Sequence, residues 1–197
     1  AIKENRPRAY EDFIAVAEDL VRRKVTSARH LACSGGSNGG LLVGNMLTMR
    51  PDLFGAIVCG SPLLDMERYT KLLAGPSWMD EYGNPDGPND WAYIRTFSPY
   101  HNVKKGVRYP PTLFTSSGRD DRVHPGHARK MVAKLRADHQ NVLYYENVEG
   151  GHAGAAIRAD GVERPEASGV LRTAGVAAGV IEVGQAEIVA ELVREDA

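Results

Sequence analysis

Three short motifs along the chain carry residue types that could act together in acyl transfer. The first, Gly35-Gly36-Ser37-Asn38-Gly39, fits the pattern G-x-S-x-G, in which a serine stands at the tip of a sharp turn between a strand and a helix. Small residues two positions before and after the serine leave room for that turn. An apolar segment precedes the motif and an amphipathic one follows it. We therefore favour Ser37 as a nucleophile over the alternatives of a plain glycine-rich turn or a phosphate loop.

The other two motifs supply an acid and a base, which a serine nucleophile needs. Asp120 and Asp121 follow the apolar segment 111–117, and His152 follows the segment 141–148. Serine, acid and histidine thus come in the chain order of doubly wound hydrolases, each at the carboxyl end of a predicted strand. The alternatives are a helix N-cap for either aspartate and a solvated loop position for the histidine. The residues alone leave the choice between the two aspartates open.

Two further histidines, His124 and His127, lie three residues apart and raise the question of a metal site. No acidic residue or cysteine stands near them at ligand spacing. We therefore expect no metal and no cofactor.

The elements that must position these motifs alternate along the chain. Apolar periodicity predicts helices at 9–24, 38–49 and 125–137, with short strands at 30–33, 55–60, 111–117 and 141–148. The stretch 61–109 is rich in Pro, Gly, Asn and Asp, which favours short helices and loops. Strands that alternate with helices predict an α/β fold, with a mostly parallel sheet and helices on both faces.

Composition describes an ordinary globular chain. It has 197 residues with a formal net charge of −1, which gives no electrostatic reason to expect nucleic acid or an acidic membrane as a partner. No apolar run approaches the roughly 20 residues that span a bilayer. The two cysteines, Cys33 and Cys59, are too few for a disulfide framework, so we expect buried thiols and a cytoplasmic protein, subject to any signal upstream of Ala1. The absence of an initial Met indicates a piece of a longer protein.

Taken together, several segments resemble the catalytic domain of the prolyl oligopeptidases, over roughly residues 5–154. They are GGSNGGLLV (35–43), RPDLFG (50–55), SWMDEYG (77–83), SPYHNV (98–103), DDRV (120–123) and GGH (150–152). The resemblance implies a serine peptidase of the α/β-hydrolase fold that cleaves short peptides on the carboxyl side of proline. It makes Ser37 the nucleophile, His152 the general base and Asp120 the group that orients it, while Asn38 lends its backbone N–H to the oxyanion hole.

The same resemblance assigns a substrate pocket. Arg122 corresponds to an arginine that anchors a peptide carbonyl, and Trp78 to a tryptophan that stacks on the proline ring. Tyr82 and Val123 would line the same pocket. Trp78 and Tyr82 are four residues apart, so on a helix they share a face. A flat indole suits a proline ring and an arginine fork suits a carbonyl, although ordinary core packing is the alternative for both aromatic residues.

The chain also departs from the family. It has no trace of a β-propeller, and the strands that should precede the nucleophile strand would lie upstream of Ala1. A tyrosine that donates to the oxyanion is missing with them, and Tyr10 is too close to a helix start to replace it. The nucleophile strand would then be a sheet edge, which favours a homodimer.

Residues 155–197 form an atypical tail, which differs from the truncated hydrolase domain at 1–154. Ala153 replaces an expected Gly, and the tail contains no aromatic residue. We expect a final amphipathic helix at 185–195, built on Ile188, Val189, Leu192 and Val193.

Three hypotheses follow from the sequence. The first is a prolyl oligopeptidase-like peptidase, and the second is an esterase or acyl hydrolase of the same fold. Their substrates would be short proline-containing peptides or small esters. The third is an inactive or weakly active fragment that self-associates.

Overall fold

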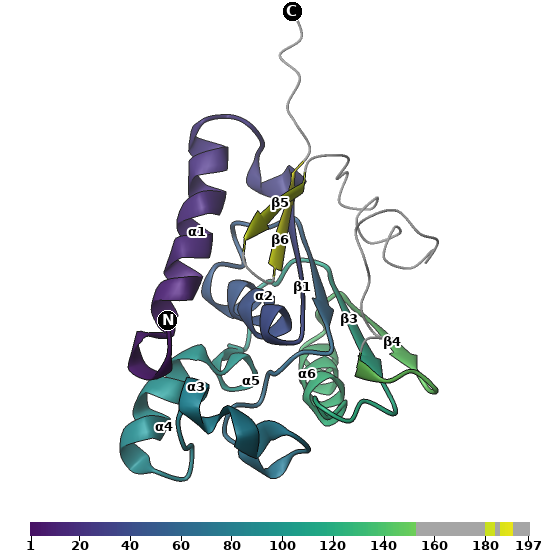
Figure 1. Cartoon of the computed structure of the whole chain (residues 1–197). Helices are drawn as coiled ribbons and strands as arrows, with labels where there is room; N and C mark the ends of the chain where they lie inside the picture. The colour runs from purple at the N-terminus through teal and green to yellow at the C-terminus, as the bar shows by residue number, and fades with distance from the viewer. Residues whose placement is uncertain (153–179, 184–185, 191–197) are drawn as a thin grey trace, which may run out of the picture.

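A six-stranded sheet forms the centre of the molecule in a computed structural model, which describes residues 1–152, 180–183 and 186–190 (Figure 1). The strands are β1 (Leu31–Gly36), β2 (Ala56–Gly60), β3 (Thr112–Ser117), β4 (Val142–Asn147), β5 (Val180–Val183) and β6 (Ala186–Ala190). Their order across the sheet is β4-β3-β2-β1-β6-β5. Strands β1 to β4 are parallel, as predicted, and their carboxyl ends share one edge of the sheet.

Three longer helices pack on the sheet: α1 (Pro7–Arg22), α2 (Asn38–Met49) and α6 (Gly126–Ala137). The parallel strands follow one another in a single direction across the sheet. Since parallel crossovers are almost always right-handed, α2 and α6 lie on the same face. The Cys59 thiol in β2 accordingly donates to the backbone oxygen of Gly40 in α2, at 3.3 Å. Buried residues of all three helices join one core with Leu31, Cys33, Ile57 and Phe114 of the strands. The helices expected on the second face are not among the described residues.

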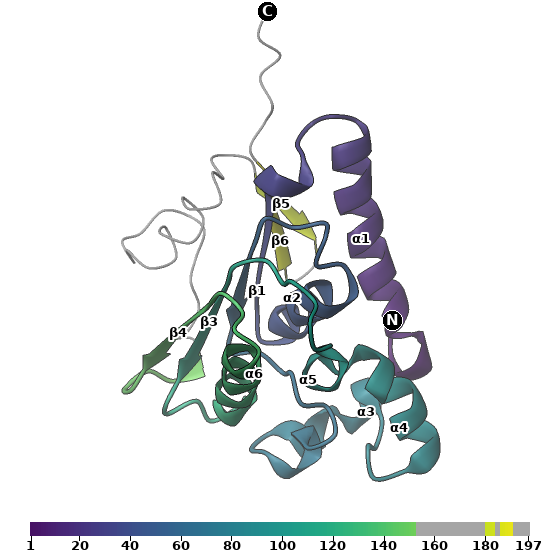
Figure 2. The same cartoon turned by 180° about the vertical axis from the view of Figure 1, so that it is seen from behind.

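The segment between β2 and β3 consists of short helices and turns, as its composition predicted. They are η3 (Tyr69–Lys71), η4 (Gly75–Trp78), α3 (Met79–Tyr82), α4 (Pro88–Ile94), η5 (Arg95–Phe97) and α5 (Pro99–Asn102). Two further turns of 3-10 helix precede α1 and β1, at η1 (Lys3–Asn5) and η2 (Ala28–His30). Viewed from behind, α3, α4 and α5 gather near the start of α1, below the strands (Figure 2).

Strands β5 and β6 correct two expectations about the tail and the sheet edge. The helix expected at 185–195 is wrong over its described part, because Ala186–Ala190 is a strand. It pairs antiparallel with β1 from Leu31 to Gly35, so the nucleophile strand is not an edge. Both differences have the same physical reason. Without a neighbour on this side, β1 would leave a row of unpaired N–H and C=O groups, and a segment rich in β-branched residues can pair with them. The domain division at residue 154 stays a prediction, since 153–179 lie outside the described residues.

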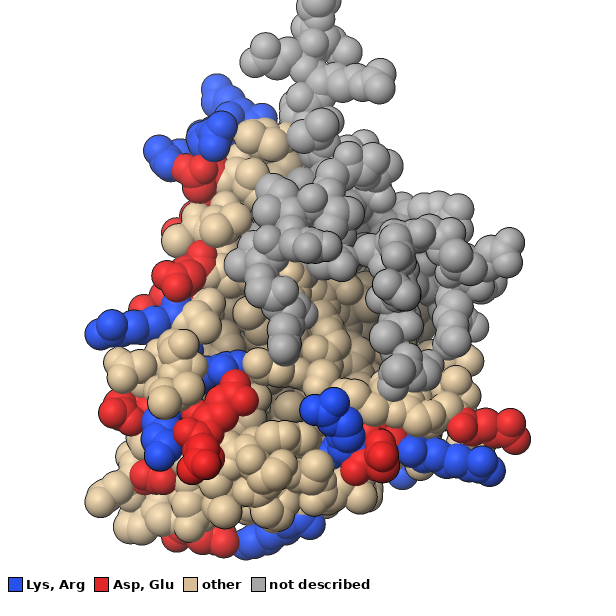
Figure 3. Space-filling model, in the orientation of Figure 1, with Lys and Arg blue, Asp and Glu red and all other residues tan. Residues whose placement is uncertain are grey.

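Surface charge and thiols agree with the composition. Acidic and basic side chains are interspersed over the face shown in Figure 3. Cys33 and Cys59 are both free and buried, and burial raises the pKa of each thiol. Among the described residues, no helix is both long enough and apolar enough to cross a bilayer.

Candidate active site

Ser37 stands at a strained turn between β1 and α2. Its backbone has φ 57° and ψ −117°, a region that residues with a side chain rarely adopt. The Ser37 N–H donates to the backbone oxygen of Gly60 at the end of β2, at 2.9 Å, and its own oxygen accepts from the Leu41 N–H at 3.1 Å. The turn is therefore fixed on both sides, and it places the half-buried Ser37 at the carboxyl edge of the parallel strands.

Gly35 of this motif, and Gly40 directly after it, are required by space. A Cβ added at Gly35 would lie 2.3 Å from the backbone oxygen of Gly39, and one at Gly40 would lie 2.8 Å from the oxygen of Gly60. At Gly36, by contrast, the nearest such atom is the Gly60 oxygen at 3.8 Å. The close approach of the strand end to the first turn of α2 thus explains the first glycine of the G-x-S-x-G pattern.

Asp120 and His152 lie in contact at the ends of β3 and β4. The His152 Nδ1 atom is 2.8 Å from Asp120 Oδ2 and 3.0 Å from Oδ1. Asp120 Oδ1 also accepts the backbone N–H groups of Arg122 and Val123, both at 2.9 Å. The Asp120 side chain is almost fully buried, whereas Asp121 is exposed. Of the two aspartates, Asp120, which the family resemblance selected, is therefore the one that faces the histidine.

Ser37 and His152 share the carboxyl edge of the sheet but are not joined by a hydrogen bond within the described part of the chain. His152 is half-buried, with 19% of its side chain exposed. Because Nδ1 faces Asp120, Nε2 is the ring atom left for another partner. Hydrogen bonds between catalytic groups are often long before substrate binds, so the separation does not remove Ser37 from the site.

The four residues expected around the substrate occupy two neighbouring segments. Trp78 is half-buried against the core at the end of η4, and Arg122 is exposed. Val123 is 3% exposed and Tyr82 is 2% exposed, so little of either side chain faces solvent. The Ala74 N–H donates to the Arg122 oxygen at 3.3 Å, which ties the loop after β3 to the segment that carries Trp78.

Asn38, the first residue of α2, lies in a polar cluster whose other members are Arg6, Tyr10, Glu81 and Tyr82. The Tyr82 hydroxyl donates to Asn38 Oδ1 at 2.9 Å, and Arg6 donates to the same oxygen. Arg6 also contacts Glu81 at 2.5 Å and Tyr10 at 3.3 Å. Tyr10 is fully buried with its hydroxyl facing Arg6, which agrees with its unsuitability as an oxyanion donor.

Arg6 and Glu81 were missed by sequence reasoning. Arg6 precedes a helix and Glu81 follows Asp80 in an acidic pair, and charged residues at such positions are typically solvated. The one usable signal was indirect: Glu81 stands next to Tyr82, which the resemblance had placed near the site.

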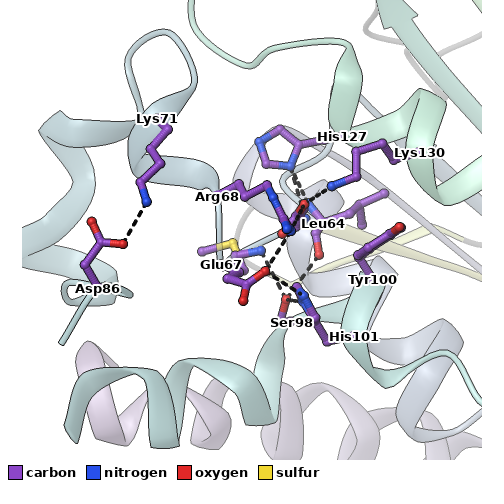
Figure 4. Close-up of polar contacts among 12 residues, drawn as sticks. Leu64, Glu67, Arg68, Lys71, Asp86, Ser98, Tyr100, His101, His127 and Lys130 are labelled. Carbon is purple, nitrogen blue, oxygen red and sulfur yellow. Dashed lines mark hydrogen bonds and ion pairs between the residues drawn. The ribbon is translucent and has the colours of Figure 1, made fainter. Parts of the chain in front are cut away.

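A second polar cluster connects the loop after β2 to α5 and α6 (Figure 4). Asp65, 1% exposed, faces Lys130 and Arg68, while Glu67 contacts Arg68 at 2.7 Å and His101 at 3.4 Å. Asp65, Glu67 and His101 stand close enough together to hold a metal ion. Their carboxylates already face cations, however, so the arrangement is that of an ion-pair network.

His124 and His127 each accept hydrogen bonds from backbone N–H groups. His124 Nδ1 accepts the Gly126 N–H at 2.9 Å. His127 Nδ1 accepts the backbone N–H groups of Leu64 at 3.3 Å and Asp65 at 3.1 Å. Each ring is thus occupied by backbone groups of its own surroundings.

Comparison with known proteins gives consistent matches. The model of the prolyl oligopeptidase family matches residues 2–167. An uncharacterised peptidase of Sinorhizobium fredii, y4nA, is 56% identical over 155 residues, and a prolyl endopeptidase of Elizabethkingia miricola is 44% identical over 136 residues. These alignments cover 79% and 68% of this chain, but only 21% and 19% of the relatives.

A solved structure, from a study of two prolyl endopeptidases, superposes with a TM-score of 0.76 at 44% identity. The superposed region covers 78% of this chain and 23% of the solved chain, which supports the partial α/β-hydrolase fold. The chain thus spans about a fifth of the length of the relatives that it matches.

Proposed function

The chain belongs to the prolyl oligopeptidase family, and we propose that it carries the acyl-transfer centre of a serine peptidase that cleaves short peptides after proline. The observation that carries the proposal is the combination of a strained Ser37 turn with the pair of buried Asp120 and half-buried His152 on the same edge of the sheet.

In the proposed reaction, His152 acts as the general base. Asp120 accepts from Nδ1–H, which leaves Nε2 unprotonated and able to take the Ser37 proton. Ser37 Oγ attacks the substrate carbonyl, and the negative charge develops on the carbonyl oxygen. His152 then gives the proton to the leaving amine as the C–N bond breaks. A water molecule, deprotonated by the same histidine, releases the acyl group from Ser37.

The N-terminus of α2 supplies stabilisation for the oxyanion. The first backbone N–H groups of a helix have no partner inside it, and Asn38 is the first residue of α2. Its N–H directly follows the nucleophile, where a tetrahedral intermediate would place its oxygen. A preorganised donor of this kind contributes a factor of about 10²–10³ in rate.

Substrate specificity is proposed to come from the segment that carries Trp78 and the loop that carries Arg122. An indole face suits a proline ring, and an exposed guanidinium can donate to a peptide carbonyl. The hydrogen bond from Ala74 to the Arg122 backbone keeps these two segments adjacent.

Two chromogenic substrates test the proposal. We expect a blocked Gly-Pro p-nitroanilide to be hydrolysed faster than the matching Gly-Ala compound, with all turnover lost in Ser37→Ala. Turnover of p-nitrophenyl acetate without any prolyl hydrolysis would instead support the esterase alternative. No Ser37-dependent turnover of either substrate by folded protein would identify an inactive fragment.

A further inference from the structure

Arg6 uses three separate nitrogens for partners on three different helices. Its Nε donates to the Tyr10 hydroxyl in α1, Nη1 to Glu81 Oε1 in α3, and Nη2 to Asn38 Oδ1 in α2. Arg6 itself is 8% exposed. A buried guanidinium whose donors are divided in this way fixes the relative placement of the elements that it touches.

The most consequential partner is Asn38, which follows the nucleophile. Its side-chain oxygen accepts from Arg6 and from the Tyr82 hydroxyl, and its Nδ2 lies 3.5 Å from Glu81 Oε1. The amide is therefore held by three neighbours, none of which belongs to the Ser37 turn. Ser37 adopts a strained backbone conformation, and such conformations persist only where the surrounding structure fixes them.

The second partner is the Tyr82 ring. The Arg6 guanidinium carbon lies 5.2 Å from the centre of that ring, within the range of a cation–π contact. Burial raises the pKa of Tyr82, and it raises the pKa of Tyr10 to about 12. Both hydroxyls therefore stay protonated at neutral pH, so Tyr82 remains a donor to Asn38.

We propose that Arg6 is a positioning residue of the acyl-transfer centre, which holds Asn38 and Tyr82 in place beside Ser37 without contacting the substrate. The inference rests on the proposed function, since it assigns Arg6 a part in the same reaction. A lysine could keep the ion pair with Glu81, but a single ammonium on a flexible stem cannot serve three separated partners in a fixed fork. Arg6→Lys therefore separates the charge of Arg6 from its geometry.

The experiment measures the rate of covalent labelling by a fluorophosphonate, at increasing probe concentrations and with folded protein quantified by circular dichroism. Removing an oxyanion donor costs about 10²–10³ in rate. In Arg6→Lys, Asn38 and its oxyanion-donating N–H should be misplaced. The saturated labelling rate of this variant should therefore fall about tenfold or more, with probe affinity nearly unchanged. Arg8→Lys, at an exposed position of α1, is the matched control and should label like the wild type.

Glu81→Gln is the second variant, in case Arg6→Lys folds poorly. It keeps the shape of the side chain but removes the charge that holds Arg6, so it should also slow labelling. If Arg6 has only a structural role, Arg6→Lys should have a lower melting temperature but the wild-type saturated labelling rate per folded molecule. That result would overturn the inference. Absence of labelling in the folded wild type would be a different result, because it would overturn the proposed function itself.

Discussion

Two adjacent aspartates show how strongly local surroundings decide the chemistry of a residue. Asp120 is buried, accepts two backbone N–H groups and faces His152, whereas Asp121 is exposed. Their residue type and predicted strand end are the same, so these features alone could not separate them, and only the resemblance to the family selected Asp120. The difference arises from the loop backbone, which turns its N–H groups toward one carboxylate only.

Replacing each aspartate by asparagine tests this difference. Asp120→Asn should lower kcat for the Gly-Pro anilide by about 10⁴, because an amide cannot hold His152 in the tautomer that accepts the Ser37 proton. Asp121→Asn keeps the same change of charge and should remain within about twofold of the wild type. Equal losses in the two variants would contradict the assignment of Asp120.

Gly35 and Gly36 offer a second matched pair. A Cβ at Gly35 would meet the backbone of Gly39 at 2.3 Å, whereas at Gly36 the nearest atom lies at 3.8 Å. Gly35→Ala should lower the free energy of unfolding by about 1–3 kcal/mol, as overpacking does, and should also reduce activity. Gly36→Ala should be tolerated. Urea denaturation of both variants measures the difference. Equal stability would show that the turn has room for a Cβ at Gly35, contrary to the close contact with Gly39 in the structure.

At the scale of elements, His127 fixes the loop after β2 to α6. Its Nδ1 accepts two backbone N–H groups, which requires that Nδ1 carry no proton and hence that the ring be neutral. Burial lowers the pKa of His127 to about 4, from an ordinary value near 6.5. The neighbouring Asp65 opposes this change, while His124 and Lys130 add to it.

The pH dependence of stability should report this histidine. Between about pH 6.5 and pH 4 the unfolded chain binds a proton that the folded chain does not, so stability falls as the pH falls through that window. The contribution of His127 to the slope of the unfolding free energy against pH should approach about 1.4 kcal/mol per pH unit within this window. Above pH 6.5 that contribution should vanish. Denaturation midpoints across this range measure it.

His127→Asn provides the control, because the asparagine oxygen can accept the same two N–H groups without titrating. Its stability should change less with pH over the same window. An unchanged slope in this variant would mean that another group is responsible. Asp65 acts at lower pH: burial tends to raise the pKa of its carboxyl, but Lys130, His101 and Arg68 together lower it.

At the scale of the whole molecule, the sheet is extended by strands from the far end of the chain. The yellow β6 lies beside β1, and β5 lies on the far side of β6, so the parallel strands β1 to β4 are extended at the β1 side (Figure 1). Ala186 to Ala190 pair with β1 residues Gly35 to Leu31 in antiparallel register. The edge strands of the described sheet are therefore β4 and β5.

Removing the tail strands should expose the β1 edge. A variant that ends at residue 179 should self-associate or aggregate, because the backbone groups of β1 lose their antiparallel partner. Light scattering coupled to gel filtration would compare its mass with that of the full chain. A monomeric, equally stable truncated variant would show that β5 and β6 are dispensable for the sheet.

The alternation of strands and helices was readable from the sequence because helices and strands have different apolar periodicities and several elements are bounded by a Gly or Pro. The α2 helix, for example, begins and ends where the pattern predicted, at Asn38 and Met49. The tail was not readable in this way. Ile188 and Val189 fit both a helical stripe and a β-strand, and the open edge of β1, a tertiary feature, favours the strand.

The most direct test of the central claim is covalent labelling of the folded chain by a fluorophosphonate, with the modified residue located by peptide mass spectrometry. We predict stoichiometric modification at Ser37, its complete loss in Ser37→Ala, and a rate lowered by about 10³ or more in His152→Ala. Folded wild-type protein that stays unmodified, or that is modified at another serine, would contradict the assignment of Ser37, Asp120 and His152 as an acyl-transfer centre.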